Sequence, residues 1–214
     1  MQAGTEAKEF APPKPMSDQR AERTAAAVRT AQSKVAAVQP DAGADRLLRA
    51  AANARTQRQR IVWLHRWGAA HFEPLAVVSA CQPGCSHCCH LSATITSTEA
   101  QLIGEVIRRK PAEPANVLTL QQAVDELDSA QALTSRHMGS PCPFLGADQR
   151  CNIYEHRPFV CRTHLSLADD ASLCSTEAGP EAVVPRADTR QAVAIFLMAD
   201  PSARLADIRD FFPN

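Results

Sequence analysis

The chain has 214 residues, and its 23 Lys and Arg side chains balance 23 Asp and Glu side chains, so the formal net charge is zero. Bulk charge therefore gives no reason to expect a nucleic-acid or membrane-surface partner. No stretch approaches the roughly 18 apolar residues of a membrane helix, and the opening residues lack the apolar core of an export signal. We therefore expect a cytoplasmic protein with no membrane contact, in a reducing compartment where structural disulfides are rare.

Two helical segments are expected in the N-terminal part of the chain. Residues 1–16 are polar and contain several prolines, which predicts disorder, whereas 17–38 has good helix propensity but almost no large apolar side chain to bury. A second helix is expected from about 44 to 72, with Pro74 ending it. The early half of this helix is basic and is expected to project. The later half carries bulky apolar side chains, among them Trp63, Leu64 and Trp67, and is expected to dock on the remaining chain.

Basic side chains are concentrated in this N-terminal part. Through residue 60 there are 11 Lys and Arg against 6 Asp and Glu, and afterwards there are 12 against 17. Such an excess is typical of a solvated helix face, and it leaves open a protein partner bound through the basic helix.

Helices are also expected throughout the rest of the chain, where strand signal is weak. The first spans about 99–110, with Thr98 as the N-cap and Gln101 completing a capping box. Others are expected over about 115–137, 189–199 and 203–212.

The predicted fold class is therefore mostly α, a small helical domain organised around cysteine-rich metal-binding loops with an N-terminal helical arm. We divide the chain into a disordered or helical arm (1–40), a long basic and amphipathic helix (41–73) and a cysteine-cluster metal-binding domain (74–214).

All eight cysteines lie between residues 81 and 174, a clustering that indicates metal rather than scattered burial. The first cysteine block consists of Cys81, Cys85, Cys88 and Cys89. A two-residue gap lets one tight turn direct two thiolates at one ion. Adjacent residues in an extended loop point to opposite sides, so Cys89 is open to three interpretations: a ligand of a second ion, a core residue or a redox thiol.

The second cysteine block consists of Cys142, Cys151 and Cys161, separated by eight and nine residues. These gaps are too long for one knuckle and suit ligands presented separately by a loop, a turn and a helix end. His90 and His164 lie close to the two blocks in sequence and are candidate additional ligands.

The two blocks together resemble a known family. The pattern Cys81-x3-Cys85-x2-Cys88-Cys89, followed by Cys142-Pro-Phe-Leu, Cys151-x-Ile-Tyr-Glu-x-Arg-Pro and Cys161-Arg, resembles the CxxCxxCC family of zinc- or iron-chelating domains, the YkgJ-like cysteine-cluster proteins of bacteria. The resemblance covers about residues 80–165. It implies a centre of zinc, iron or an iron–sulfur cluster, and it implies as ligands all seven cysteines of the two blocks. Cys174 lies outside the pattern and is expected to be a buried thiol.

The identity of the metal stays open at this point. The spacing Cys-x3-Cys-x2-Cys also holds the 4Fe–4S cluster of radical-SAM enzymes, but the segment after Cys89 lacks the strand–helix alternation of their barrel. A cluster without that barrel needs four thiolates, as does a structural zinc ion, and thiolates suit both metals. The seven thiolates on offer exceed what one zinc site uses, which favours iron–sulfur or iron.

Three functions are compatible with such a centre. The protein is a metal-binding module with a structural or regulatory centre, a redox enzyme or electron carrier that uses the cluster, or a protein that chelates and delivers zinc or iron. Nucleotide-binding glycine motifs, a serine-hydrolase elbow and an HExxH motif do not occur in the sequence.

Overall fold

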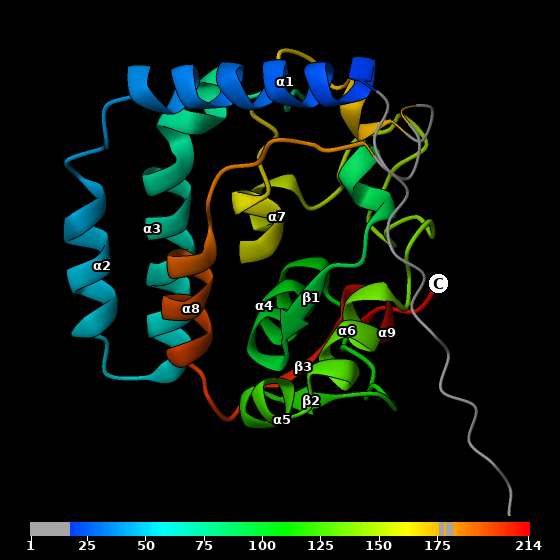
Figure 1. The fold of residues 1–214 in the computed structure, drawn as a ribbon. Coiled ribbons are helices and arrows are strands. Elements are labelled where there is room, and N and C mark those ends of the chain that lie inside the picture. Colours follow the sequence, from blue (N-terminus) through cyan, green and yellow to red (C-terminus); the bar gives the residue numbers. More distant parts are fainter. Residues whose placement is uncertain (1–17, 176–177, 179–181) are drawn as a thin grey trace, which may run out of the picture.

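A computed structural model describes residues 18–175, 178 and 182–214. Its regular elements are predominantly helical, which confirms the mostly α fold class (Figure 1). In chain order they are α1 (Asp18–Ala37), α2 (Ala44–Ala52), α3 (Gln57–Val78), η1 (His87–His90), β1 (Thr94–Thr96), α4 (Ser97–Ile107), β2 (Leu118–Thr119), α5 (Leu120–Asp125), α6 (Leu127–Ser135), η2 (Tyr154–His156), α7 (Phe159–Thr163), η3 (Ser172–Cys174), α8 (Arg190–Met198), β3 (Arg204–Asp207) and α9 (Ile208–Phe211).

The larger hydrophobic core forms around α3. Figure 1 shows α2 and α8 beside α3, and α1 lying across one end of this layer. Trp67 of α3 and Phe196 of α8 both pack on Phe159, the first residue of α7. The Phe159 and Phe196 rings stack with centroids 4.4 Å apart. Helix α7, which carries Cys161, is therefore anchored by an aromatic side chain in the core.

The expected single helix over 44–72 is interrupted. Helix α2 ends at Ala52, and α3 begins after Thr56, whose hydroxyl accepts a hydrogen bond from the Gln59 amide at 3.2 Å. The two helices pack against each other with Ala44 and Ala51 buried, so the early half does not project. The prediction of one continuous helix was wrong because the apolar pattern continues across the break. Thr56 is a good N-cap, and a new helix begins after it.

Helix α3 also runs past Pro74, which was expected to end it, and continues to Val78. A proline removes one backbone donor, but its fixed φ is compatible with a helix. Leu75 and Ala76 pack against the core, and this packing keeps the last turn helical.

Helix α1 buries more than its sequence suggested. Ala31 is only 8% exposed, and Lys34 Nζ donates a hydrogen bond to the Ala168 carbonyl at 2.5 Å. The disorder predicted for residues 1–16 lies outside the described residues, and the three-part division of the chain stays a prediction.

A small antiparallel sheet with strand order β1-β3-β2 contributes to a second hydrophobic core, separate from the core around α3. Ile95 of β1 pairs with Ala206 of β3, and both are almost fully buried. The sequence predicted a helix at 203–212, but this segment forms strand β3 followed by a single helical turn. The single helix expected over 115–137 is divided into strand β2 and helices α5 and α6. Strands this short carry too few alternating residues to give a period-two pattern.

The capping box of α4 is shifted by two residues from its predicted place. Thr96, not Thr98, is the N-cap, and its partner is Glu99, not Gln101. Among the helices that the structure describes, none is long and apolar enough to cross a membrane.

Candidate metal centre

The first cysteine block follows directly from the end of α3. The Ala80 amide donates to the Ser166 carbonyl at 2.9 Å, which fixes the chain just before Cys81. Gly84 has a φ of +90°, a left-handed conformation that a glycine adopts without strain. The resulting turn is closed by the Cys85 amide, which donates to the Gln82 carbonyl at 2.9 Å.

Cys88 and Cys89 lie in the 3-10 helix η1, not in an extended loop. The argument that their side chains must point to opposite sides therefore fails. The two thiols lie close enough for each to shift the pKa of the other. Neighbouring positions of this block are thus close enough to face one site.

The second cysteine block reaches the same place from three different local structures. Cys142 lies in the turn before Phe144, Cys151 is in an isolated β-bridge with Leu145, and Cys161 lies on α7. The cysteines are thus presented by three separate local structures, but Cys151 lies in a bridge instead of a turn and Cys161 in the middle of a short helix instead of at its end.

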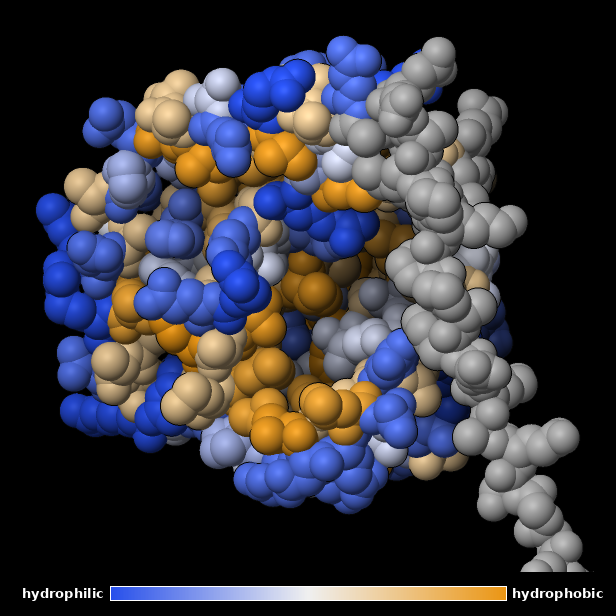
Figure 2. All heavy atoms as spheres, in the orientation of Figure 1, coloured by the Kyte–Doolittle hydropathy of each residue, from blue (hydrophilic) through white to orange (hydrophobic). Residues whose placement is uncertain are grey.

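The structure brings the two cysteine blocks together. The Cys142 amide donates to the Cys89 carbonyl at 2.8 Å, and the Gly139 amide donates to the His90 carbonyl at 2.7 Å. Between the blocks lies a cavity of about 360 Å³. The cysteines among its lining residues are Cys85, Cys88, Cys89, Cys142, Cys151 and Cys161. Figure 2 shows one face of the molecule, which is hollowed near its centre and has hydrophobic side chains around the hollow.

The remaining sequence-predicted residues lie around this cavity. His164 lines it, whereas Cys81 and His90 are not among its described lining residues. The Cys81 sulfur accepts a hydrogen bond from the Ser166 amide at 3.4 Å. Burial raises the pKa of the Cys174 thiol, and the nearby Cys81 adds to this rise. Which of these side chains are ligands stays a prediction.

In the absence of a cation, the second cysteine block favours neutral thiols. Burial raises the pKa of the thiols of the second cysteine block above the ordinary value of 9.0, and charges on neighbouring cysteines raise it further. The hydrogen bond from Cys89 lowers the pKa of Cys88 to about 7, and the same bond raises that of Cys89. Burial, assisted by Arg186, lowers the pKa of His164 to about 4, so its ring is neutral at pH 7.

This donor set fits a soft or borderline metal. Thiolates and a neutral imidazole are the ligands of zinc and of iron–sulfur centres, and no Asp or Glu is among the described residues that line the cavity. A divalent cation would replace the thiol protons and offset the charges that raise these pKa values. Within the described ranges, no three His, Cys, Asp or Glu side chains are already arranged to hold one ion.

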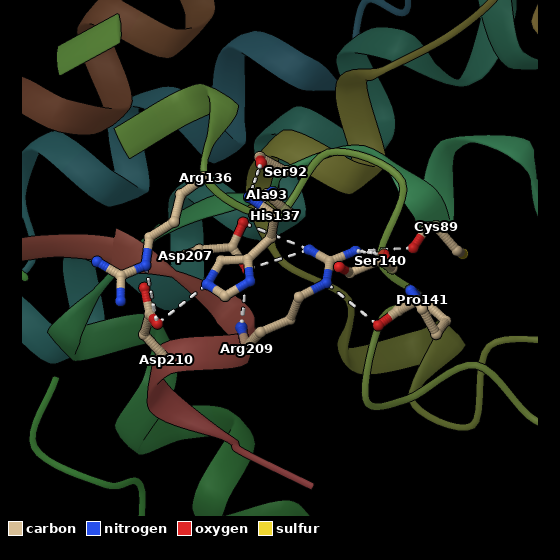
Figure 3. A network of polar contacts seen from close by, with 10 residues as sticks. All are labelled: Cys89, Ser92, Ala93, Arg136, His137, Ser140, Pro141, Asp207, Arg209 and Asp210. Carbon is tan, nitrogen blue, oxygen red and sulfur yellow. Dashed lines mark hydrogen bonds and ion pairs between the residues drawn. The ribbon is translucent and has the colours of Figure 1, made fainter. Parts of the chain in front are cut away.

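Two buried charged residues support the site and were not identified from the sequence. Glu99 is 3% exposed and accepts a hydrogen bond from the Phe159 amide at 2.8 Å, at the start of the helix that carries Cys161. Arg209 is 8% exposed and contacts the backbone of both cysteine blocks (Figure 3). The sequence gives no signal for Arg209, which lies among other charged residues in the segment 204–210.

A cavity walled by cysteines from two separate blocks defines a cysteine-cluster, metal-chelating class of domain. Comparison with known families agrees: residues 80–178 match the family CxxCxxCC, described as "Putative zinc- or iron-chelating domain". These residues therefore form a CxxCxxCC domain, and the match supports metal binding by it. Neither the curated proteins nor the solved structures yielded a match to the chain.

Proposed function

We propose that this protein binds an iron–sulfur cluster in the cavity between its two cysteine blocks. The observation that carries the proposal is that six cysteines line one cavity of about 360 Å³. One tetrahedral zinc ion uses four ligands and little volume, whereas a cluster of several iron and sulfide ions fills more space. The number of thiolates and the size of the cavity therefore favour a cluster over a single ion.

Four thiolates from the two blocks would hold the cluster, and His164, which also lines the cavity, offers an imidazole nitrogen as a further donor. A bound cluster supplies one-electron redox chemistry or a structural cross-link between the blocks. The chain itself supplies a mostly apolar wall that includes Ile153, Val160 and Ile208. Such a wall limits access of water and oxidants to the thiolates.

Arginine side chains on the cavity wall offset the negative charge of the thiolates. Burial raises the pKa of Cys151 and of Cys142, and the charges of Arg157 and Arg209, respectively, partly offset that rise. Because four thiolates leave a net negative charge on either type of centre, such cations stabilise the loaded state. These arginines favour a multi-thiolate centre of either metal.

Purification under anaerobic, reducing conditions tests the proposal directly. The expected product is brown, contains iron and acid-labile sulfide in equal amounts, and loses visible absorption on reduction by dithionite. A colourless chain with one tightly held zinc ion and no sulfide would contradict the proposal and identify a structural zinc module.

A second candidate, reversible chelation and delivery of zinc or iron, is favoured by one observation. Cys88 is the exposed cysteine of the pocket, so an incoming ion or an acceptor can reach it from solvent. In that case a mild chelator removes the metal while the far-ultraviolet circular dichroism spectrum stays unchanged. The protein partner of the N-terminal basic helix stays a prediction.

A further inference from the structure

Arg209 is a buried cation at the start of the C-terminal helix α9. Its guanidinium Nη1 lies 3.0 Å from the Asp207 carboxylate, which is itself fully buried. The other Asp207 oxygen accepts a hydrogen bond from the Ala93 amide at 2.7 Å. The Asp207–Arg209 pair is therefore held in one orientation, with its charges balanced inside the second core.

The remaining donors of Arg209 are used on the two cysteine blocks (Figure 3). Nη2 donates to the Cys89 carbonyl at 2.9 Å and to the Ser140 carbonyl at 2.6 Å, and Nε donates to the Pro141 carbonyl at 3.1 Å. Cys89 ends the first block, and Ser140 and Pro141 lead directly into Cys142 of the second. One side chain thus joins backbone segments that are about fifty residues apart in sequence.

We propose that Arg209 is a positioning residue of the metal centre, holding Cys89 and Cys142 at the spacing that metal binding requires. The inference rests on the proposed function, because it needs a metal in the cavity. It extends the centre beyond residues 80–178, the segment matched by the family, to a C-terminal element outside it.

The chemistry of arginine explains why this residue occupies the position. A guanidinium presents five donors in a rigid planar fork and stays charged, so it can bind Asp207 and three carbonyl oxygens at once. A lysine ammonium is a single point of charge with three donors and cannot span the same acceptors. Arg209 also lines the cavity, so its charge faces the thiols that it positions.

Cobalt titration of the metal-free full chain under anaerobic, reducing conditions tests the inference. Co²⁺ takes tetrahedral thiolate sites, and its thiolate charge-transfer absorption measures both affinity and the number of sulfur ligands. The variants are Arg209→Lys and Arg209→Met. The control is Arg204→Met on the neighbouring strand, where the arginine side chain pairs with the exposed Glu113.

We expect both Arg209 variants to raise the cobalt dissociation constant by about 10–100-fold, as loss of an outer-shell partner does at other metal sites. Their absorption per cobalt falls as well, because fewer thiolates reach the ion. Arg204→Met should match the wild-type chain in both respects.

A purely structural role would lower the melting temperature of the metal-free chain without changing the cobalt spectrum or the affinity of the folded fraction. That result overturns the inference. So does a cobalt dissociation constant of Arg209→Lys equal to that of the wild type, or an Arg209→Lys variant that does not fold. A wild-type chain that gives no thiolate–cobalt absorption overturns the proposed function instead, and the inference with it.

Discussion

Glu99→Gln tests whether the buried carboxylate organises the helix that carries Cys161. Each carboxylate oxygen of Glu99 accepts a backbone hydrogen bond: Oε1 from the Phe159 amide at 2.8 Å, and Oε2 from the Thr96 amide at 3.0 Å. A glutamine has the same shape, but only one of its two terminal atoms is an acceptor. Its NH₂ group must therefore face one of these two amide donors.

The cost of this substitution follows from the contacts. One buried N–H left without an acceptor costs about 1–3 kcal/mol, and the surviving bond loses its charge assistance, about 1 kcal/mol more. We expect the free energy of unfolding of the metal-free chain to fall by about 2–4 kcal/mol. Urea denaturation with linear extrapolation measures this change.

Glu105→Gln is the matched control, because Glu105 lies on the same helix but pairs with Arg58 at the surface. Exposed ion pairs contribute about 0–1 kcal/mol, so this control should change stability little. If Glu99→Gln is as stable as Glu105→Gln, the bridge from Glu99 to Phe159 does not support α7.

Three further predictions concern the cysteines and the packing beneath them. Cys151→Ser should abolish metal retention, whereas Cys174→Ser should leave the metal content nearly unchanged, as measured by elemental analysis. Gly68→Ala should lower the free energy of unfolding by about 1–3 kcal/mol in urea, because its added Cβ would meet the Phe159 ring at 2.5 Å. The metal-free chain should lose stability as the pH rises above 9. In the unfolded chain the thiols then ionise, whereas in the folded chain the thiols of the second cysteine block stay protonated. The free energy of unfolding should fall by up to about 1.4 kcal/mol per pH unit for each buried thiol. Stability unchanged between pH 8 and pH 10, in thermal melts of the metal-free chain, would refute that interpretation.

The cysteine chemistry could be predicted from the sequence because thiols are rare and their local spacing limits where they can point. The convergence of the two blocks was implied by the resemblance to the CxxCxxCC family, which takes ligands from both of them. The helices were predictable where apolar side chains repeat over several turns, as in α3 and α8.

The supporting residues could not be predicted, because their partners carry no sequence signal. Arg209 binds carbonyl oxygens of Cys89, Ser140 and Pro141, and Glu99 binds the amide of Phe159. Every residue type has a carbonyl oxygen, so nothing in the sequence marks which carbonyls an arginine will reach. The 3-10 turn at Cys88 and Cys89 escaped notice for a related reason, since four residues show no periodicity.

The location of the cavity gives a physical reason for metal binding and folding to be coupled. Phe159 and Trp67 belong to the core around α3, whereas Cys142 and Cys151 pack against the core beneath the sheet. Cys161 lies two residues from Phe159, and so thiols anchored in different cores face one cavity. A metal bound by both sets of thiols joins the two cores covalently through its ligands. Separation of the cores would then break metal–sulfur bonds, so the loaded chain should unfold in one transition at a higher temperature than the metal-free chain.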